Sequence, residues 1–406
     1  MGRKRVAILV QGLYGGGMER VAAQLSIMLS DAGYDTYILV RGFNKRKAYR
    51  YKGKIISIPL AVCDGRQSIG IESVLMLRNA YLLRKCKKIN KIDITISFAP
   101  EMNVMNMLSG TGDRKILTVH SCLSVRQDFA GLCYKHNMYR MYNYAYKVIA
   151  VSKWCEKDLI DHYGVNANKV RTIYNPIEGN DRSDGILIKE NIVLIVGRLQ
   201  DIKQQWHIIR AFKMVIEKIP DAKLIIAGQG ENRKYLHNLS VDLGINNNVI
   251  FEGFVKEIEE LYQQAKCVVF SSASEAFPCS VIEAISQGIP VVAADCPGGI
   301  REIIAKNDDC GSKIEKATKV SGGILTPELD GIKYDAKTPL TAAECEMAKG
   351  IIYLLENNCA YAESCLKISS EFNESRIMKK WLELMGEIGK HDQNVKKGKK
   401  NPLANA

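Results

Sequence analysis

Short apolar segments alternate with longer segments of helical periodicity along the first part of the chain. The apolar segments are four to seven residues long, rich in Val and Ile, and closed by Gly, Pro or polar residues; they are 5–10, 36–40, 55–58, 92–98, 116–119 and 148–151. Between the first two, residues 17–32 place Val21, Leu25, Met28 and Leu29 on one face. This alternation predicts parallel strands joined by helices in a doubly wound α/β sheet.

A second series of the same kind follows, with apolar segments at 192–196, 224–227, 249–251, 268–271 and 290–294. Between the two series, the polar and turn-rich residues 178–185 come directly after Asn175-Pro176 and predict a linker. We therefore expect two Rossmann-like domains, 1–182 and 183–370. A terminal helix at 371–390 should pack back toward the first domain, and 391–406 should form a disordered basic tail.

Composition agrees with two globular domains. The chain has 406 residues, of which 47% are hydrophobic and 25% charged. It contains no run of the roughly 18 to 20 apolar residues that a membrane span needs. The apolar run at 6–10 is too short for a signal peptide, so we expect the protein in the cytoplasm. The 12 cysteines include no Cys-x-x-Cys pair and are interpreted as small core residues.

Positive charge is concentrated in the first half. Residues 1–182 hold 29 Lys and Arg against 14 Asp and Glu, whereas 183–406 hold 28 against 30. One basic cluster comprises 45–47, Arg50, Lys52 and Lys54; a second, 84–88, ends a helical segment that carries Leu75, Leu77, Tyr81 and Leu82. The asymmetry predicts peripheral attachment to the cytoplasmic face of an anionic plasma membrane, with a solvated face and a soluble acceptor as the alternative. Nucleic acid is not expected, because no recognised motif or aromatic series accompanies the clusters.

Ligands bind beyond the carboxyl ends of the strands in sheets of this kind. The segment at 192–196 ends in Gly197-Arg198-Leu199, and Lys203 follows five positions after the arginine. A guanidinium and an ammonium at this edge suit a diphosphate. Two solvated surface cations would give the same sequence pattern. The next strand end carries Gly228-Gln-Gly230, which either lets the backbone approach a ligand or forms a tight turn.

Residues 274–284 read Ser-Glu-Ala-Phe-Pro-Cys-Ser-Val-Ile-Glu-Ala. Pro278 suits the start of a helix and Gly288 its end, so the amides of Cys279, Ser280 and Val281 should form an anion site. At about 100° per residue, Glu283 falls on the polar face with Ser280, opposite a buried stripe. That stripe is expected to contain Val281, Ile282, Ala284 and Ile285.

The two carboxylates of this segment therefore have different positions. Glu275 lies in the loop before the helix, where it can reach sugar hydroxyls, and Glu283 lies inside the helix, where it can accept hydrogen bonds from a ribose. A solvated helix face would explain Glu283 alone, but it does not explain Glu275 in an apolar loop.

In the first half, a glycine-rich turn containing Gly15, Gly16 and Gly17 joins the first strand to the first helix. Its backbone amides could contact a phosphate. The turn is not the Gly-x-Gly-x-x-Gly fingerprint, and no suitably placed acidic residue follows the second strand, which argues against a dehydrogenase. His120 closes the strand at 116–119, where either a structural or a functional role is open.

Taken together, these pieces resemble the retaining glycosyltransferases of GT-B fold that form family four, across about residues 4 to 385. The matching pieces are Gly15–Gly17, Thr118-Val-His120, Asn175-Pro176, Gly197-Arg198-Leu199 with Lys203, Gly228-Gln-Gly230, Gly253-Phe254, Glu275 with Glu283 in a Glu-x7-Glu pattern, and 290–302. The resemblance implies two Rossmann-like domains facing each other across a cleft. It also implies a role in surface polysaccharide or lipid-linked glycan assembly.

The same resemblance implies roles for single residues. Arg198 and Lys203 would hold the donor diphosphate, Glu275 the sugar and Glu283 the ribose. Val255 would lie near the base. The glycine turn at 15–17 and His120 would complete the site from the opposite domain.

Two features depart from the family. Gln204 stands where the family usually has glycine, and the segment 307–320 is longer and more polar than the usual connection. The second could be an acceptor-side elaboration or a loop.

The expected reaction is transfer of a hexosyl unit from a nucleotide-sugar, preferably UDP-linked, with retention, to a glycan or lipid-linked acceptor. No convincing Asp-x-Asp motif is present, so we expect neither a metal nor another cofactor. A UDP-sugar epimerase, a phosphorylase and a catalytically inactive nucleotide-sugar-binding partner are the alternatives.

Overall fold

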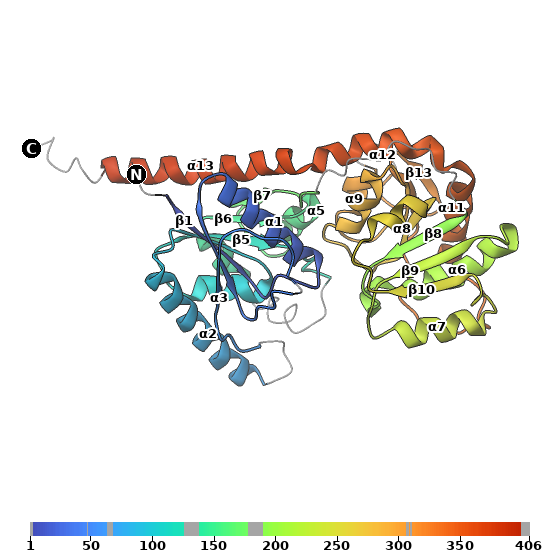
Figure 1. Ribbon diagram of the computed structural model, residues 1–406, viewed down its shortest axis with the longest axis horizontal. Coiled ribbons are helices and arrows are strands. Elements are labelled where there is room, and N and C mark those ends of the chain that lie inside the picture. The colour runs from blue at the N-terminus through green and yellow to red at the C-terminus, as the bar shows by residue number, and fades with distance from the viewer. Residues whose placement is uncertain are drawn as a thin grey trace, which may run out of the picture. The chain divides into compact units, whose positions relative to one another are not determined.

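The computed structural model describes residues 3–46, 48–62, 68–125, 138–177, 190–305, 308 and 311–398, with only the backbone at 69, 138–139 and 390–398. Contacts between Cα atoms divide the chain into two compact units, which Figure 1 shows in sequence colours. The first unit is Met1–Pro176 together with Glu374–Ala406, and the second is Ile177–Asn373. The predicted linker at 178–185 lies outside the described residues.

The first unit contains a seven-stranded parallel sheet in the order β3-β2-β1-β4-β5-β6-β7. Its strands are β1 (Arg5–Val10), β2 (Asp35–Val40), β3 (Lys54–Ser57), β4 (Ile94–Ser97), β5 (Arg114–Val119), β6 (Lys147–Ala150) and β7 (Val170–Thr172). The first six confirm the six apolar segments of the first series. β1, β4 and β5 are almost entirely buried, which is why they read as continuous apolar runs.

The described helices of this unit, apart from the last, lie in the connections between its strands. They are α1 (Gly17–Asp31), α2 (Ile69–Ile89), α3 (Pro100–Leu108), the 3-10 helix η1 (Met138–Tyr144), α5 (Lys153–Asp161) and, at the end of the chain, α13 (Glu374–Gly398). The predicted apolar face of α1 is buried. α13 runs to Gly398, so the prediction of a disordered tail is wrong for 391–398, whereas 399–406 lie outside the described residues.

The second unit has a sheet of the order β10-β9-β8-β11-β12-β14-β13, in which only the pair of β13 and β14 is antiparallel. Its strands are β8 (Ile192–Val196), β9 (Lys223–Ala227), β10 (Val249–Gly253), β11 (Cys267–Phe270), β12 (Val291–Ala294), β13 (Thr318–Val320) and β14 (Gly323–Thr326). β13 is the last part of the polar segment 307–320 and forms the edge of the sheet, whereas the described residues 311–317 before it form a loop. A role of this segment on the acceptor side stays a prediction.

Short helices cover this second sheet (Figure 1). They are η2 (Asp201–Lys203), α6 (Gln205–Lys218), α7 (Arg233–Asp242), α8 (Glu259–Gln264), α9 (Cys279–Ser286), α10 (Ile300–Ile304), α11 (Ala342–Asn357), η3 (Asn358–Tyr361), α12 (Ala362–Ser369) and η4 (Ser370–Phe372). In both sheets the strand order reverses at the centre, between β1 and β4 and between β8 and β11. Ligand sites of doubly wound folds form at the carboxyl ends of the strands beside this reversal.

The amino ends of β4 and β5 enclose a buried ion pair. The Lys87 ammonium, on α2, lies 2.9 Å from the Asp113 carboxylate, and both side chains are 1% exposed. Thr95 donates a hydrogen bond to the same carboxylate at 2.5 Å. Lys87 therefore belongs to the core of the first unit and not to the basic surface cluster at 84–88 in which the sequence places it.

Cysteine, metal and membrane expectations can be compared with the described residues. The nine described cysteines form no disulfide; five are buried, as predicted, but Cys359 is exposed. In the described part of the chain, no three His, Cys, Asp or Glu side chains gather as a metal site would require. No described helix combines the length and the apolar character needed to cross a bilayer.

We predict that Asp113→Asn destabilises the first unit by about 3 to 5 kcal/mol at neutral pH, because it leaves the buried ammonium of Lys87 without a counter-charge. Burial raises the pKa of Asp113, but the charges of Lys87 and Lys115 outweigh it and hold the pKa at about 2. The wild-type protein should lose this contribution as the pH falls from about 4 to about 2. Urea unfolding at several pH values measures both effects. Asp242→Asn, at an exposed position on α7, is the control, and equal stabilities for the two variants would contradict the prediction.

Candidate functional site

The loop after β8 carries the two cations that the sequence assigns to a diphosphate. Arg198 is exposed, and its guanidinium makes no hydrogen bond or ion pair with any described residue. Its backbone carbonyl accepts a hydrogen bond from the side chain of Gln205 at 2.8 Å, which fixes the loop against the start of α6. Lys203 ends η2 and is partly buried.

At this edge of the sheet, Glu275 contacts both Lys203 and Ser272. The Lys203 ammonium lies 2.5 Å from its Oε1 atom, and the Ser272 hydroxyl donates to the same oxygen at 2.6 Å. The Glu275 side chain is 10% exposed, so the pair is shielded from most of the solvent. Its Oε2 atom makes no hydrogen bond with a described residue. One carboxylate oxygen is therefore held in place, while the other remains available to a ligand.

The backbone of Glu275 is fixed by the loop after β12. Its amide donates to the Pro297 carbonyl at 3.0 Å, and its carbonyl accepts from the Gly299 amide at 2.8 Å. The loop after β11 is in turn bound to η2, because the Ser271 hydroxyl donates to the Lys203 carbonyl at 2.8 Å. Three strand-end loops thus determine where the carboxylate lies.

Gly228 and Gly230 are required by the approach of neighbouring backbone. A Cβ atom on Gly228 would lie 1.8 Å from the Gly197 carbonyl oxygen, and one on Gly230 would lie 2.2 Å from that of Leu199. The Leu199 amide also donates to the Gln229 carbonyl at 2.9 Å. Of the two interpretations of this motif, the structure supports a tight packing of loops; contact of Gly230 with a donor stays a prediction.

α9 begins and is buried as its sequence predicts. Pro278 directly precedes it, Gly288 follows it at φ +71°, and the predicted stripe is buried. The Val281 amide, however, donates to the Pro278 carbonyl at 3.1 Å. The prediction of a free amide is therefore wrong at Val281. Cys279 and Ser280 occupy the first turn, where helix amides can meet an anion.

Glu283 is oriented by a residue from another helix. The hydroxyl of Tyr262, on α8, lies 3.1 Å from Glu283 Oε2 and 3.2 Å from the Ser280 carbonyl oxygen. Ser280 and Glu283 are both half-buried whereas the stripe beside them is buried, as the predicted polar face of α9 requires. Val255, two residues after the end of β10, is partly exposed.

Gln204 adopts the left-handed backbone conformation, with φ 49° and ψ 35°, directly after Lys203. Glycine reaches this region without the steric cost of a Cβ atom, which explains why glycine is usual at this position in the family. The side chain of Gln204 fills the space beside Gly331, where a Cβ atom would lie 2.7 Å from its Nε2 atom. The departure in sequence therefore preserves the turn that carries Lys203.

In the first unit, the glycine turn lies at the carboxyl end of β1. Gly15 has a φ of +95°, Gly16 caps α1 and Gly17 begins it. A Cβ atom on Gly16 would lie 2.5 Å from a carboxylate oxygen of Glu19, so this acidic side chain lies against the helix terminus. The turn has the predicted position, but a carboxylate already occupies part of it.

His120 follows β5 at the same edge of this sheet. Its ring stacks on Phe98, with 5.2 Å between ring centroids, and its Nε2 atom lies 3.1 Å from the Thr118 hydroxyl oxygen. Burial lowers the pKa of His120 to about 3, so the ring is neutral at physiological pH. The Thr118 hydroxyl donates to the Ser97 carbonyl at 2.9 Å and must accept from His120. We therefore assign the proton to Nε2, which leaves Nδ1 as an acceptor.

Sequence reasoning missed Ser272, Tyr262 and Phe98. Ser272 lies three residues before Glu275 in the chain, so its nearness was a signal that could have found it. Tyr262 and Phe98 are aromatic residues in other elements, and only the fold brings them to Glu283 and His120. Cys296 is a buried residue near Glu275. Burial and the charge of Glu275 raise the pKa of its thiol, so the sulfur stays protonated.

Two family models match adjoining parts of the chain. The model described as Glycosyltransferase Family 4 matches residues 15–179, and the model described as Glycosyl transferases group 1 matches residues 177–320. The chain belongs to glycosyltransferase family 4. The boundary between the two matches falls close to the boundary between the two structural units.

Relatives of this family 4 chain include an uncharacterised glycosyltransferase of Methanocaldococcus jannaschii, which is 33% identical over 62% of this chain and 64% of its own length. A Campylobacter jejuni N-acetylgalactosaminyltransferase named for a diphospho-undecaprenol substrate is 25% identical over 77% of this chain and 86% of its own. The chain thus spans less than two thirds of the first of these relatives.

Solved structures confirm the GT-B fold, which combines two Rossmann-like domains. Anabaena HepE in complex with UDP and glucose has a TM-score of 0.72 and 19% identity, covering 95% of this family 4 chain and all of HepE. Sucrose-phosphate synthase of Thermosynechococcus elongatus has a TM-score of 0.74 and 16% identity, covering 96% of this chain and all of its own.

We predict that Gly230→Ala destabilises the second unit by about 1 to 3 kcal/mol, because the new methyl group must displace the Leu199 carbonyl and the loop that carries Arg198. Thermal unfolding measures the change. Gly244→Ala is a stringent comparison, because Gly244 has a positive φ, which strains any residue with a side chain, but has no atom within 4 Å of the position that a methyl group would take. A loss at position 230 no greater than that at 244 would contradict the packing argument.

Proposed function

We propose that this chain transfers a sugar from a nucleotide-sugar, preferably UDP-linked, to a glycan or lipid-linked acceptor with retention of the α-configuration. The observation that carries this proposal is the contact of Glu275 with Lys203 at 2.5 Å and with Ser272 at 2.6 Å. The exposed Arg198 lies five residues before Lys203 in the chain, after the same strand. Two cations near a carboxylate that has one oxygen left for a ligand suit a molecule that joins a diphosphate to a polyol.

The diphosphate is assigned to Arg198 and Lys203. The guanidinium can bind two phosphate oxygens at once, and it has no described partner to give up. Lys203 must share its ammonium between Glu275 and the phosphate, which its three donors allow. The amides of Cys279 and Ser280 at the start of α9 would add hydrogen bonds to the same group.

The two hydroxyl-bearing ends of the donor are assigned to the two carboxylates. Glu275 would accept sugar hydroxyls on Oε2, because Oε1 already takes Lys203 and Ser272. Glu283, held by Tyr262, would accept from the ribose diol. Val255 and Gly230 would lie near the nucleotide. Hydrogen bonds to a charged group contribute about 1.5 to 3 kcal/mol each, enough to position a sugar.

In the first unit, we assign His120 and the turn at 15–17 to the reacting groups. His120 is neutral, so it cannot neutralise phosphate charge; its Nδ1 atom would instead accept a hydrogen bond from a substrate hydroxyl. The amides at Gly15, Gly16 and Gly17 would act as donors once Glu19 moves aside.

The proposed chemistry is attack by the acceptor hydroxyl on the anomeric carbon from the face that the diphosphate leaves. The new bond joins the acceptor oxygen to the anomeric carbon, and the bond to the phosphate oxygen breaks. That phosphate oxygen takes the hydroxyl proton, so the products are the α-glycoside and the nucleoside diphosphate. Arg198 and Lys203 stabilise the charge that develops on the leaving group.

We predict that Arg198→Ala and Glu275→Gln each lower kcat/KM by about a hundredfold or more, because each removes a group that stabilises the transition state. Transfer is measured with a panel of UDP-, GDP- and ADP-sugars and lipid-linked acceptors, using the exposed Lys213→Gln as control. Rates within a few-fold of wild type would refute the assignment. Conversion of donor to its epimer without an acceptor would instead indicate an epimerase.

The leaving-group charge is assigned to side chains and amides alone, so we propose that no metal or other cofactor is required. Transfer rates should stay within a factor of about two when excess chelator is added, since the cations of Arg198 and Lys203 remain in place. The assay uses protein dialysed against EDTA, with and without added Mg²⁺ or Mn²⁺. A loss of activity that either ion restores would contradict this.

The acceptor is proposed to be lipid-linked, with the protein on the surface of an anionic leaflet at the cytoplasmic face. The relative from Campylobacter jejuni is named for an undecaprenol-linked substrate. α2 supplies the membrane-facing surface. At about 100° per residue its exposed side chains fall within roughly 160° of the helix circumference. They are Ile71, Ser73, Val74, Leu77, Arg78, Tyr81, Arg84, Lys85, Lys88 and Ile89.

This face combines the two properties that bind amphipathic helices to lipid. Val74, Leu77 and Tyr81 are 65%, 60% and 66% exposed, which is unusual for apolar side chains on one turn after another. Each basic residue near an anionic surface adds about 1 kcal/mol of attraction. Leu75 and Leu82, in contrast, are partly buried, so they contribute to the core side of the helix.

We predict that Val74→Ser/Leu77→Ser/Tyr81→Ser reduces binding to phosphatidylglycerol-containing vesicles by about tenfold or more, because burial of these side chains drives insertion. Co-sedimentation measures the binding, with phosphatidylcholine vesicles and high salt as comparisons. The control is Val241→Ser, an exposed apolar residue on α7. Unchanged binding of the triple variant, or no wild-type binding to anionic vesicles, would contradict the surface assignment.

A further inference from the structure

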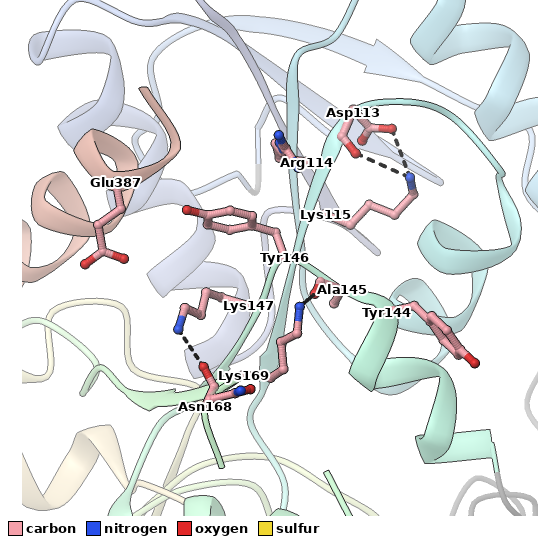
Figure 2. Close-up of a pocket in the computed structure, with 10 residues that line it drawn as sticks. All are labelled: Asp113, Arg114, Lys115, Tyr144, Ala145, Tyr146, Lys147, Asn168, Lys169 and Glu387. Atoms are coloured by element: carbon pink, nitrogen blue, oxygen red, sulfur yellow. Dashed lines mark hydrogen bonds and ion pairs between the residues drawn. The ribbon is translucent and has the colours of Figure 1, made fainter. Parts of the chain in front are cut away.

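A pocket of about 550 Å³ lies in the first unit, at the amino ends of β5, β6 and β7. The glycine turn and His120 lie at the carboxyl ends of strands of the same sheet. The pocket is therefore on the opposite edge from those residues. Its wall includes Arg114, Lys147, Lys169 and Tyr146 from the strand ends, and Glu387 from α13 (Figure 2). Its size falls in the range of small-molecule sites, about 300 to 1,000 Å³.

Two lysines of the wall each donate a hydrogen bond to the backbone just before the other lysine. The ammonium of Lys147, at the start of β6, donates to the Asn168 carbonyl at 2.7 Å, and that of Lys169, just before β7, donates to the Ala145 carbonyl at 3.1 Å. Figure 2 shows both hydrogen bonds as dashed lines. Neither ammonium forms an ion pair with a described carboxylate. Each keeps donors for a ligand, because an ammonium group has three.

The two carboxylates of the wall do not cancel this charge. Glu387 pairs with Arg171 at 2.8 Å. Asp113 pairs with the buried Lys87 at 2.9 Å and with Lys115 of the wall at 3.3 Å. Arg171 and Lys87 lie outside the lining, so each wall carboxylate is balanced without Lys147 or Lys169. The charge of Lys147 and Lys169 therefore remains uncompensated.

Arg114 and Tyr146 of the wall contact each other. The Arg114 guanidinium lies over the Tyr146 ring at 5.6 Å from its centroid, which orients a planar cation in the same pocket wall as the two lysines. Both ammonium groups are fixed by backbone carbonyls and both side chains are partly buried, so little conformational entropy is lost when an anion binds.

We propose that this pocket binds a phosphate group through Lys147 and Lys169, with Arg114 as an additional donor. The phosphate belongs either to a free phosphate compound or to a lipid headgroup. The volume exceeds that of a phosphate, so the remainder of the ligand would lie along Tyr146 toward Glu387. Because α13 directly follows Asn373, the ligand would contact the segment through which the chain leaves the second unit.

The test is calorimetric titration of the full chain at low ionic strength, with saturating UDP present to occupy a donor site. Sodium pyrophosphate represents the free source, and dihexanoyl phosphatidic acid below its micelle concentration represents the headgroup. Lys147→Gln/Lys169→Gln should weaken binding of at least one probe by about tenfold or more, because two charge-assisted hydrogen bonds are lost. Lys147→Arg/Lys169→Arg should retain it, which separates lost charge from misfolding.

The matched control is Lys213→Gln/Lys218→Gln, which removes the same charge from exposed positions on α6. It should bind both probes as the wild type does. Weaker binding of pyrophosphate alone identifies a free phosphate compound, and weaker binding of phosphatidic acid identifies a headgroup; either supports the site. Equal binding by wild type and the Gln variant, or no wild-type binding of either probe, overturns it. The comparison holds whether or not UDP binds, so it is independent of the proposed transfer reaction.

Discussion

The Lys203–Glu275 ion pair is the constraint on which the proposed site in the second unit depends. It joins the loop after β8 to the loop after β11, and the backbone of Glu275 is fixed by the loop after β12. A carboxylate and an ammonium this close must be kept together by their surroundings, because an exposed pair contributes little. Here Ser272 and the limited exposure supply that setting. In the reaction that we propose, the pair would orient Glu275 toward a sugar and leave Lys203 able to reach a phosphate.

The first unit uses the two edges of its sheet differently. At the carboxyl ends, His120 is kept neutral by burial and the glycine turn is partly covered by Glu19. The amino ends carry both buried and surface cations. The buried Lys87 forms an ion pair with Asp113, whereas the ammonium of Lys147 donates a hydrogen bond to a backbone carbonyl. The charge excess of the first half of the sequence therefore has several structural meanings: one lysine stabilises the core, others face a pocket, and those of α2 lie on a surface beside apolar side chains.

Most strands could be predicted from the sequence, because a parallel sheet buries both faces and its strands become continuous apolar runs. α9 was predicted for the complementary reason, since its buried positions recur at helical spacing. The features that could not be predicted from the sequence are weak strands and contacts between distant segments. β13 is three residues long with one exposed position, so it gives no strand signal. The burial of Lys87 is decided by Asp113, and the position of Glu283 by Tyr262, and neither partner can be identified from spacing along the chain.

The roles assigned to Glu275 and Lys203 are tested most directly by comparing the affinities of a nucleoside diphosphate and its sugar conjugate, for the nucleotide that the wild type binds best. The difference between the two affinities isolates what the sugar adds. We expect Glu275→Gln to abolish that difference while leaving diphosphate affinity within a few-fold, and Lys203→Gln to weaken both ligands. If Glu275→Gln weakened the diphosphate as much as the conjugate, or left both affinities unchanged, Glu275 would not be the group that holds the sugar.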